Sequence, residues 1–231
     1  MNSVDVYIVV EGPTEQTFVR DVLAPQMGHW GIYLHPVLIG KPGHKGGDVR
    51  FVRAKNDIGN FLRQRGDTYI STMFDYFRID SKWPGRAKVR RQMQNGATLT
   101  AIQKAKVLET ATRNEIVRSF PECGSENRFI PYIEMHEFEA LLFSDVDILA
   151  EKTGIDVGQI RVIIEGFDNP EEINDDPAKA PSKRLGTLKS GYRKVAMGKT
   201  VSEAIGIQTI RRQCPHFDSW LTKLEHLKED A

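Results

Sequence analysis

Acidic residues stand at three points where a parallel sheet would bring their side chains together. Glu11 comes directly after the apolar run Val6–Val10, and Asp75 comes directly after the run Tyr69–Phe74. A third group closes the next apolar run and comprises Glu134, Glu137 and Glu139. Open α/β sheets bind ligands at the carboxyl ends of their strands, so these acids are candidates for metal or acid/base chemistry. The plainer interpretation of Glu11 is an ordinary surface acid in a βα loop.

The chemistry that such a group favours is the binding of Mg²⁺ or Mn²⁺, because these ions prefer hard oxygen ligands. If the first and third strands are neighbours, Glu11 and Asp75 would lie within reach of one ion. Two ions bridged by carboxylates can activate a water and stabilise the leaving oxygen of a phosphodiester. Glu137 and Glu139 have another explanation, since negative charge is favourable at the start of a helix. Two residues apart on a helix, they would point in different directions.

The elements that must position these acids alternate between strand and helix. The predicted strands are Val4–Val10, Ile32–Ile39, Tyr69–Phe74 and Phe129–Glu134. The predicted helices between them are Thr14–Met27, Val49–Arg65 and Thr100–Phe120. This order predicts an α/β fold, with a mostly parallel sheet flanked by helices on both faces.

The last third of the chain has no convincing strand pattern and reads as short helices. These are expected at Asp147–Thr153, Val157–Phe167, Ser202–Cys214 and Phe217–Leu227, with a loop over Asn169–Pro181. We therefore expect two parts, an α/β domain over residues 1–147 and a helical lobe over residues 148–231 packed on it.

Composition excludes several classes of protein. The 231 residues are enough for a real core, and the formal net charge of +1 predicts no partner by itself. Cys123 and Cys214 are too few and too isolated for a disulfide framework or a zinc site. We find no signal peptide and no apolar run long enough to cross a membrane, so we expect a cytoplasmic protein without a membrane partner.

Basic residues gather in three blocks, at residues 40–55, 78–91 and 183–212. Such blocks could surround an acidic metal centre with positive charge, as a phosphodiester substrate would require. Ordinary solvated faces are the alternative. The candidates for nucleic-acid binding are Lys45, Arg78, Lys82, Arg86 and Arg184. Lys183 or Arg184 could neutralise charge on the scissile phosphate.

The segment Glu11–Glu15 reads EGPTE and resembles the E-G-x-[ST]-[DE] signature that opens a Toprim domain. The wider set VEGPTEQTFV, TMFDYF, Trp83-Pro84-Gly85 and HEFEALLFSD resembles a bacterial Toprim-superfamily domain of unknown function related to OLD-type nucleases. The resemblance runs from Val4 to about Asp145, and PSKRL at Pro181–Leu185 resembles a further motif of that family.

The resemblance implies roles for particular residues. Glu11 matches the invariant Toprim glutamate, and Asp75 matches the first aspartate of the usual D-x-D pair. Phe77 stands where the second aspartate would be. The shell of the metal would then be completed by Glu15, Glu137 or Glu139, with Asp80 as another possible substitute.

The function that the resemblance implies is a nuclease dependent on Mg²⁺ or Mn²⁺, cleaving DNA or RNA in defence against phage or plasmids. OLD-type nucleases work with an ABC-type ATPase. This sequence has no Walker motif, so such a partner would be a separate chain.

Two other functions stay open. Because the second aspartate is missing, the chain could be a catalytically degenerate module that regulates an ATPase complex. A receiver-like phosphoacceptor with Asp75 as its target is a weaker idea, because the length and the EGPTE segment argue against it.

Overall fold

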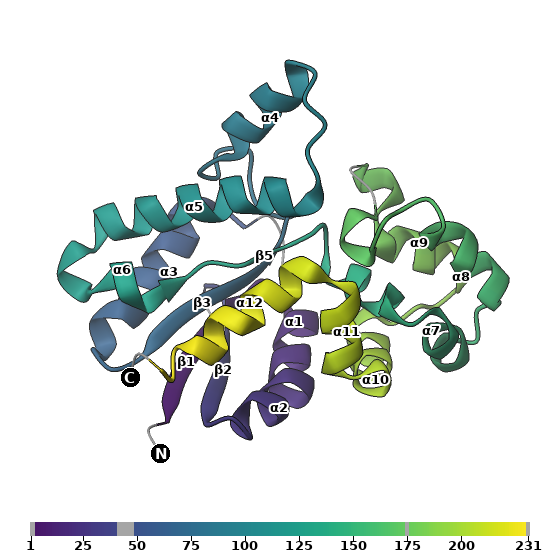
Figure 1. Cartoon of the computed structure of the whole chain (residues 1–231), viewed down its shortest axis with the longest axis horizontal. Coiled ribbons are helices and arrows are strands. Elements are labelled where there is room, and N and C mark those ends of the chain that lie inside the picture. The colour runs from purple at the N-terminus through teal and green to yellow at the C-terminus, as the bar shows by residue number, and fades with distance from the viewer. Residues whose placement is uncertain (1–2, 41–48, 174–175, 230–231) are drawn as a thin grey trace.

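In a computed structural model, which describes residues 3–40, 49–173 and 176–229, a parallel sheet lies between two layers of helices (Figure 1). Its strands are β1 Val4–Val10, β2 Ile32–Leu38, β3 Tyr69–Asp75, β4 Phe129–Ile130 and β5 Ile133–Glu134. The order across the sheet is β2-β1-β3-β4, with β5 also paired to β3. All of these pairings are parallel, as the alternation of strands and helices predicts. The fold is therefore α/β, with further helices at the C-terminal end.

The strand predicted over Phe129–Glu134 is wrong in one respect, because it is split into β4 and β5. Pro131 lies in the gap, and proline has no N–H group to donate to a sheet ladder. The hydroxyl of Thr72 fills the gap from β3: it donates to the carbonyl of Tyr132 and accepts from the Tyr132 N–H, both at 2.9 Å. The segment thus stays in register, and Glu134 is paired with Asp75 at the edge of the sheet.

The two faces of the sheet are covered by different helices. On one face, Val6, Ile8 and Val10 pack with α1 Pro13–Phe18 and with α12 Pro215–His226. On the other face, Val9 packs with α3 Phe51–Gln64 and α5 Ala101–Ser119. Burial on both faces explains why β1 is almost continuously apolar.

The helices of the first two-thirds follow the predicted order. The predicted helix Thr14–Met27 is a continuous helical segment made of α1 Pro13–Phe18, the π-helical turn Val19–Leu23 and α2 Ala24–Gly28. Thr100 caps α5 in a reciprocal capping box with Gln103. The smaller elements are α4 Arg86–Gln94, the 3₁₀ turn Pro121–Cys123, α6 Ser125–Arg128 and the 3₁₀ helix Phe138–Ser144.

The C-terminal third contains no strand among its described residues, as predicted. Its helices are α7 Val146–Thr153, α8 Val157–Ile164, α9 Pro181–Leu188, α10 Lys194–Ile205, α11 Ile207–Gln213 and α12, with 3₁₀ turns at Pro170–Glu172 and Pro177–Lys179. The single helix predicted over Ser202–Cys214 is wrong. Gly206, whose φ of 78° lies outside the helical region, separates α10 from α11.

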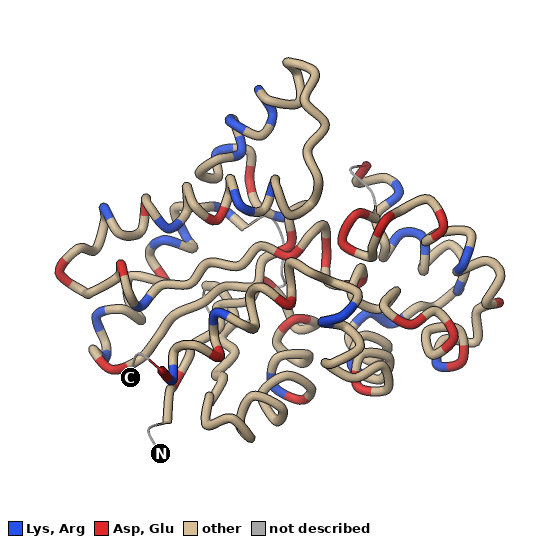
Figure 2. The backbone as a smooth tube through the Cα atoms, in the orientation of Figure 1, with Lys and Arg blue, Asp and Glu red and all other residues tan. Residues whose placement is uncertain are grey.

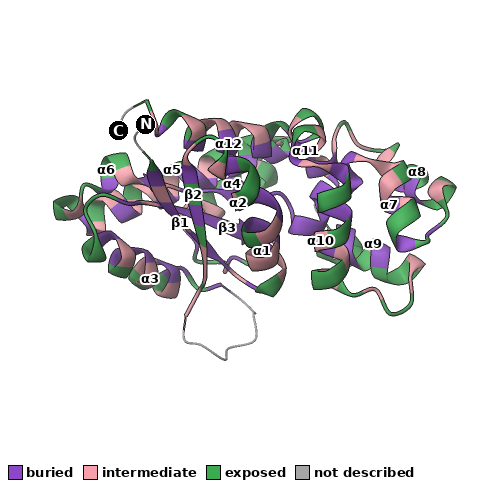
Figure 3. Cartoon of the chain, turned by 90° about the horizontal axis from the view of Figure 1, so that it is seen from below, coloured by how far each residue is buried: buried purple, intermediate pink, exposed green. Residues whose placement is uncertain are grey.

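One hydrophobic cluster runs from the sheet into these C-terminal helices, and Figure 3 shows the buried residues extending along the length of the molecule. It joins Ile8 of β1 to Leu149, Ile160 and Val201. Trp220 of α12 adds a polar tie, because its indole N–H donates to the Ser71 hydroxyl at 2.9 Å. No helix in the described ranges is both long enough and apolar enough to cross a bilayer.

Candidate functional site

Glu11 and Asp75 lie at the same edge of the sheet. β1 and β3 are neighbours, with Val10 paired to Met73, so the residues that follow them emerge together. The Asp75 side chain is buried and accepts a hydrogen bond of 3.0 Å from the Phe138 N–H. Glu11 Oε1 is 3.7 Å from Arg78 Nε, while Glu11 Oε2 is buried with no hydrogen-bond partner in the described part of the chain.

Glu137 and Glu139 reach the same lysine. Lys194 Nζ of α10 is 3.1 Å from Glu139 Oε1 and 4.0 Å from Glu137 Oε2. The prediction that these two acids point in different directions assumed that both are helical. Glu137 instead has an extended backbone (φ −156°, ψ 160°) just before the 3₁₀ helix, which lets both carboxylates approach one cation. Glu137 also accepts hydrogen bonds from the backbone N–H of Ser182 and, at 3.1 Å, from its hydroxyl.

The carboxylates are close enough to disturb one another's ionisation. We call the five acids the acidic cluster: Glu11, Glu15, Asp75, Glu137 and Glu139. Burial raises the pKa of Asp75 well above its usual value, and the charges of the other four raise it further. Burial and then Glu15 raise the pKa of Glu11 to about 8, although Arg78 opposes them. Burial raises the pKa of Glu139 to about 7 against the opposing charge of Lys194, and burial also raises the pKa of Glu15.

The acidic cluster has the donors that Mg²⁺ or Mn²⁺ prefers. All of them are carboxylate oxygens, they outnumber the cations beside them, and Glu11 Oε2 has no internal hydrogen bond to lose. As the side chains stand, no three His, Cys, Asp or Glu residues among those described are grouped closely enough to hold a metal ion. Mg²⁺ usually needs only one or two carboxylates, because it keeps several waters and takes substrate phosphate as a further ligand. The residues present therefore fit such an ion without a preassembled cage.

A cavity of about 390 Å³ opens beside the acidic cluster, where β3 meets α9 and α10. It is lined by Phe77, Arg78, Glu137, Lys183, Tyr192 and Lys194, among others. Lys183 and Glu137 thus line the same cavity, although they are 46 positions apart in the sequence. The neighbouring residue Ser182, which is 45 positions from Glu137, is hydrogen-bonded to it. In Figure 2, acidic segments meet near the middle of the molecule, between the sheet and the C-terminal helices.

The start of α9 does not offer free amides to a phosphate. The N–H of Ser182 donates to Glu137, and the N–H groups of Lys183 and Arg184 donate to the Ala180 carbonyl at 2.9 and 3.1 Å. A phosphate in the cavity would therefore meet the side chains of Arg78, Lys183 and Lys194 rather than the end of the helix.

The other predicted nucleic-acid-binding residues lie elsewhere. Arg86 donates to the Tyr76 carbonyl at 3.1 Å and covers the Tyr76 ring at 4.1 Å, in a separate hollow. Lys82 lines a hollow at the start of α3, and Arg184 donates to the Lys179 carbonyl on another side of α9. Lys45 falls outside the described residues. Of the predicted set, Arg78 lies at the cavity.

Phe77, which stands where the Toprim resemblance would place a second aspartate, is stacked on His136, with ring centroids 5.4 Å apart and planes 23° from parallel. Asp80 is turned away from the acidic cluster. Its carboxylate accepts from the N–H groups of Phe51 and Lys82, at 3.2 and 2.9 Å. Of the acids considered as replacements for the missing aspartate, Glu137 and Glu139 are the two that join the cluster.

Several residues at the site were not predicted. Lys194, Ser182 and Tyr192 reach it only because α9 and α10 pack against the 3₁₀ helix that follows Glu137, and no local pattern announces such a contact. Glu134 is fully buried, and its Oε2 accepts a hydrogen bond of 2.7 Å from the Tyr132 hydroxyl. Burial raises the pKa of Glu134 well above its usual value, with Glu171 adding to the effect. Unlike those three residues, Glu134 was predicted, as a member of the third acidic group at the end of a strand, and it is paired with Asp75 in the sheet.

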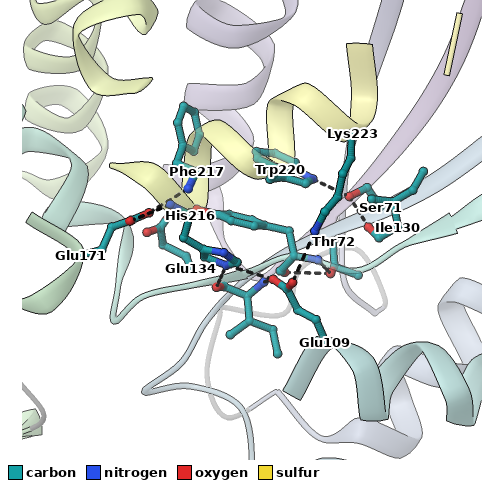
Figure 4. A network of polar contacts seen from close by, with 12 residues as sticks. Ser71, Thr72, Glu109, Ile130, Glu134, Glu171, His216, Phe217, Trp220 and Lys223 are labelled. Atoms are coloured by element: carbon teal, nitrogen blue, oxygen red, sulfur yellow. Dashed lines mark hydrogen bonds and ion pairs between the residues drawn. The ribbon is translucent and has the colours of Figure 1, made fainter. Parts of the chain in front are cut away.

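A second group of buried polar residues lies where α12 meets α5 beside β5, and we call it the His216 network (Figure 4). Glu109 Oε1 accepts from the Ile133 N–H at 3.0 Å and lies 3.0 Å from His216 Nε2, while its Oε2 lies 3.9 Å from Lys223 Nζ. Glu171 caps the start of α12 by accepting from the N–H groups of His216 and Phe217, at 2.9 and 2.8 Å. The network ties α12 to α5 and to the sheet.

Comparison with known proteins identifies the family of this chain. No curated protein matches the sequence. Among solved structures, the chain is similar to the C-terminal region of the Xanthomonas campestris pv. campestris OLD protein, with 15% sequence identity and a TM-score of 0.37 over 96% of this chain and 98% of that one. The family model called domain of unknown function DUF4276 matches residues 10–225, which is most of the sequence. The chain therefore belongs to the DUF4276 family.

Proposed function

We propose that this protein is a divalent-metal-dependent nuclease that hydrolyses phosphodiester bonds of DNA or RNA. The observation that carries the proposal is the acidic cluster at the carboxyl edge of a parallel sheet, beside a cavity lined by Arg78, Lys183 and Lys194. Acids alone would suit many cation sites. Buried acids beside three cations suit a substrate that brings both a metal ion and negative charge.

In this proposal Glu11 and Asp75 hold Mg²⁺ or Mn²⁺, and Glu15, Glu137 or Glu139 complete the shell. The ion would supply Lewis-acid activation of a water and charge stabilisation at the leaving oxygen. Lys183 neutralises charge on the scissile phosphate, with Arg78 and Lys194 holding the same group in position. Lys82, Arg86 and Arg184 would contact nucleic acid outside the cavity.

The biological setting that we propose is defence against phage or plasmids, together with a separate ABC-type ATPase. Its support is the Toprim and OLD resemblance of the sequence and the lack of a Walker motif in this chain. A direct test is to ask whether an ATPase co-purifies with the chain from its native cells and changes its cleavage rate.

A non-catalytic regulatory module is the second candidate. Phe77 in place of an acid, and the absence of a ready-made group of three ligands among the described residues, are the observations that favour it. Calorimetric titration with Mn²⁺ separates the two candidates. The nuclease requires binding that Glu11→Gln and Asp75→Asn weaken, whereas no binding at millimolar Mn²⁺ would favour the module.

The proposal is tested by incubating the protein, alone and with any ATPase partner, with single-stranded DNA, duplex DNA and RNA in Mg²⁺, Mn²⁺ or Ca²⁺. We expect cleavage in Mg²⁺ or Mn²⁺ and its loss in Glu11→Gln. The matched control is Asp67→Asn, since Asp67 is an exposed acid that pairs with Arg65 and lies before β3, at the opposite end of this strand from the cavity. Absence of cleavage on every substrate, with the partner present, would reject the nuclease.

A further inference from the structure

The aromatic residue that replaces the second Toprim aspartate lies at the cavity. Phe77 is half-buried, stacks on the His136 ring, and also contributes to the lining. His136 is itself buried and is packed edge-on against Tyr76, with ring centroids 5.2 Å apart. Phe77 is therefore a backed aromatic platform rather than a loose surface ring.

The same cavity offers a second aromatic side chain and a polar group. Tyr192, which precedes α10, contributes to the lining, and its hydroxyl is buried without a hydrogen-bond partner among the described residues. A buried hydroxyl with no partner is costly, so a ligand that donates to it or accepts from it would be favoured. The cavity thus combines π faces, one unsatisfied hydroxyl and three cations.

The size of the cavity limits what can enter it. Its volume of about 390 Å³ is near the lower end of the ~300–1,000 Å³ that is usual for small-molecule sites. A single nucleotide is an object of this class, whereas a stacked base pair with both of its backbones is not. An unpaired nucleotide also exposes the base face that an aromatic platform can cover.

We propose that the cavity binds one unpaired nucleotide, with its base stacked on Phe77 and its phosphate held by Lys183, Lys194 and Arg78. This deepens the proposed function and rests on it, because it assigns the substrate class as single-stranded nucleic acid or an unpaired end. In this assignment Phe77 cannot bind a metal ion as an aspartate would, but it recognises the base of the nucleotide.

The test is a binding measurement by fluorescence anisotropy in Ca²⁺, chosen to suppress cleavage. The probes are a labelled oligothymidylate, an abasic oligomer of the same length, and a blunt hairpin duplex. We expect the oligothymidylate to bind most tightly. We expect Phe77→Leu, which keeps an apolar side chain but removes the π face, to weaken that binding roughly tenfold or more. Phe77→Trp should restore it.

The abasic oligomer isolates the stacking, because it keeps the phosphates and lacks the bases. On this probe Phe77→Leu should bind as the natural protein does. The matched control is Phe61→Leu, since Phe61 is also half-buried and stacked, against Tyr7 at 5.2 Å, but lies on α3 away from the cavity. An equal loss on the abasic and thymidylate probes, no loss on either, or tighter binding of the duplex would overturn the assignment.

Failure of this inference is distinguishable from failure of the nuclease. Metal-dependent cleavage that Glu11→Gln abolishes, with binding that Phe77→Leu leaves unchanged, would keep the nuclease and reject the stacking site. Phe77-dependent binding without cleavage under any condition would support the site and reject the nuclease.

Discussion

Two groups of buried acids differ in where their hydrogen-bond partners come from. In the His216 network, each oxygen of Glu109 and of Glu171 has a hydrogen-bond donor or a cation from the protein itself. In the acidic cluster, Glu11 Oε2 has no such partner in the described part of the chain, and five acids face few cations. Buried polar groups that the protein satisfies fix a structure, whereas those it leaves unsatisfied are suited to a ligand.

The largest expected difference between the acidic cluster and the His216 network is in activity. We expect Asp75→Asn to lower the rate of metal-dependent cleavage roughly a thousandfold, because it removes a charged ligand at the centre of the acidic cluster. This corresponds to an increase of about 4 kcal/mol in the activation free energy. Glu171→Gln should leave cleavage per folded molecule nearly unchanged. Rates are measured on the same substrate, with circular dichroism used to correct for the folded fraction. Equal losses in both variants would mean that the two groups do not differ in role.

The acidic cluster should also make the stability of the protein depend on pH. The folded protein holds protons on Glu11 (pKa about 8) and Glu139 (pKa about 7) that an unfolded chain, with ordinary glutamates near 4.5, has released. Between pH 5 and 8 the folded state therefore binds more protons, so stability without metal should fall as the pH rises. At about 1.4 kcal/mol per pKa unit, these two groups correspond to a fall on the order of 6 kcal/mol.

Thermal unfolding across this pH range, with and without Mg²⁺ or Mn²⁺, checks that expectation. A divalent ion should stabilise the protein more at pH 8 than at pH 6, because it binds the ionised carboxylates. His216, whose pKa is raised by Glu109 against the effect of burial, contributes a slope of the same sign. Glu11→Gln isolates the acidic cluster and should flatten the curve, whereas an unchanged curve in this variant would contradict the assigned ionisation.

Single substitutions should change stability in opposite directions in the two groups. In Glu171→Gln, one backbone N–H group at the start of α12 faces the side-chain NH₂ group, which cannot accept its hydrogen bond. The free energy of unfolding should therefore fall by about 1–3 kcal/mol, and Tm by roughly 3–10 °C. Glu11→Gln removes a carboxyl that must be either protonated or unpaired, and should raise Tm at pH 8 without metal by a few degrees. Differential scanning calorimetry measures both. Destabilisation by Glu11→Gln under these conditions would show that its carboxylate is structurally satisfied.

The smallest expected effect concerns Lys194. Its ammonium group lies 3.1 Å from Glu139 Oε1 and therefore competes with a metal ion for the same oxygens. Its side chain is 42% exposed, so solvent weakens this competition. Lys194→Met should raise the affinity for Mn²⁺ by a few-fold in calorimetric titration. Lys199→Met is the control, because Lys199 belongs to the same helix but pairs with Asp21 at 3.6 Å; a similar rise there would point to net charge alone.

Much of the sheet could be predicted because its signals are local. Apolar runs such as Val6–Val10 mark buried strands, and a chain that alternates strands and helices has few topologies open to it. The positions of Glu11 and Asp75 followed directly, because parallel neighbours end at one edge. The split of the last strand at Pro131 depended on the Thr72 hydroxyl, which is not visible from the local pattern.

The cavity was harder to predict because its walls come from distant segments. Lys183 was placed by a motif resemblance, but Lys194 and Tyr192 required knowledge of how α10 packs. The break at Gly206 was missed because apolar residues continue through it at helical spacing. Arg86 and Lys82 were predicted to bind nucleic acid from a basic block in the sequence, but they lie away from the cavity. Such a block indicates positive charge and not the direction in which each side chain points.

The tie between Trp220 and Ser71 has a consequence for how the protein is made. These residues are 149 positions apart, a distance that a ribosome adding ~5–20 residues per second covers in roughly 7 to 30 s. Throughout that interval the face of β1 formed by Val6, Ile8 and Val10 lacks the α12 cover and must be kept from other nascent chains. The cavity beside Glu137 is likewise incomplete until α10 has left the ribosome, so any chemistry it supports begins only after Ile205 has been translated.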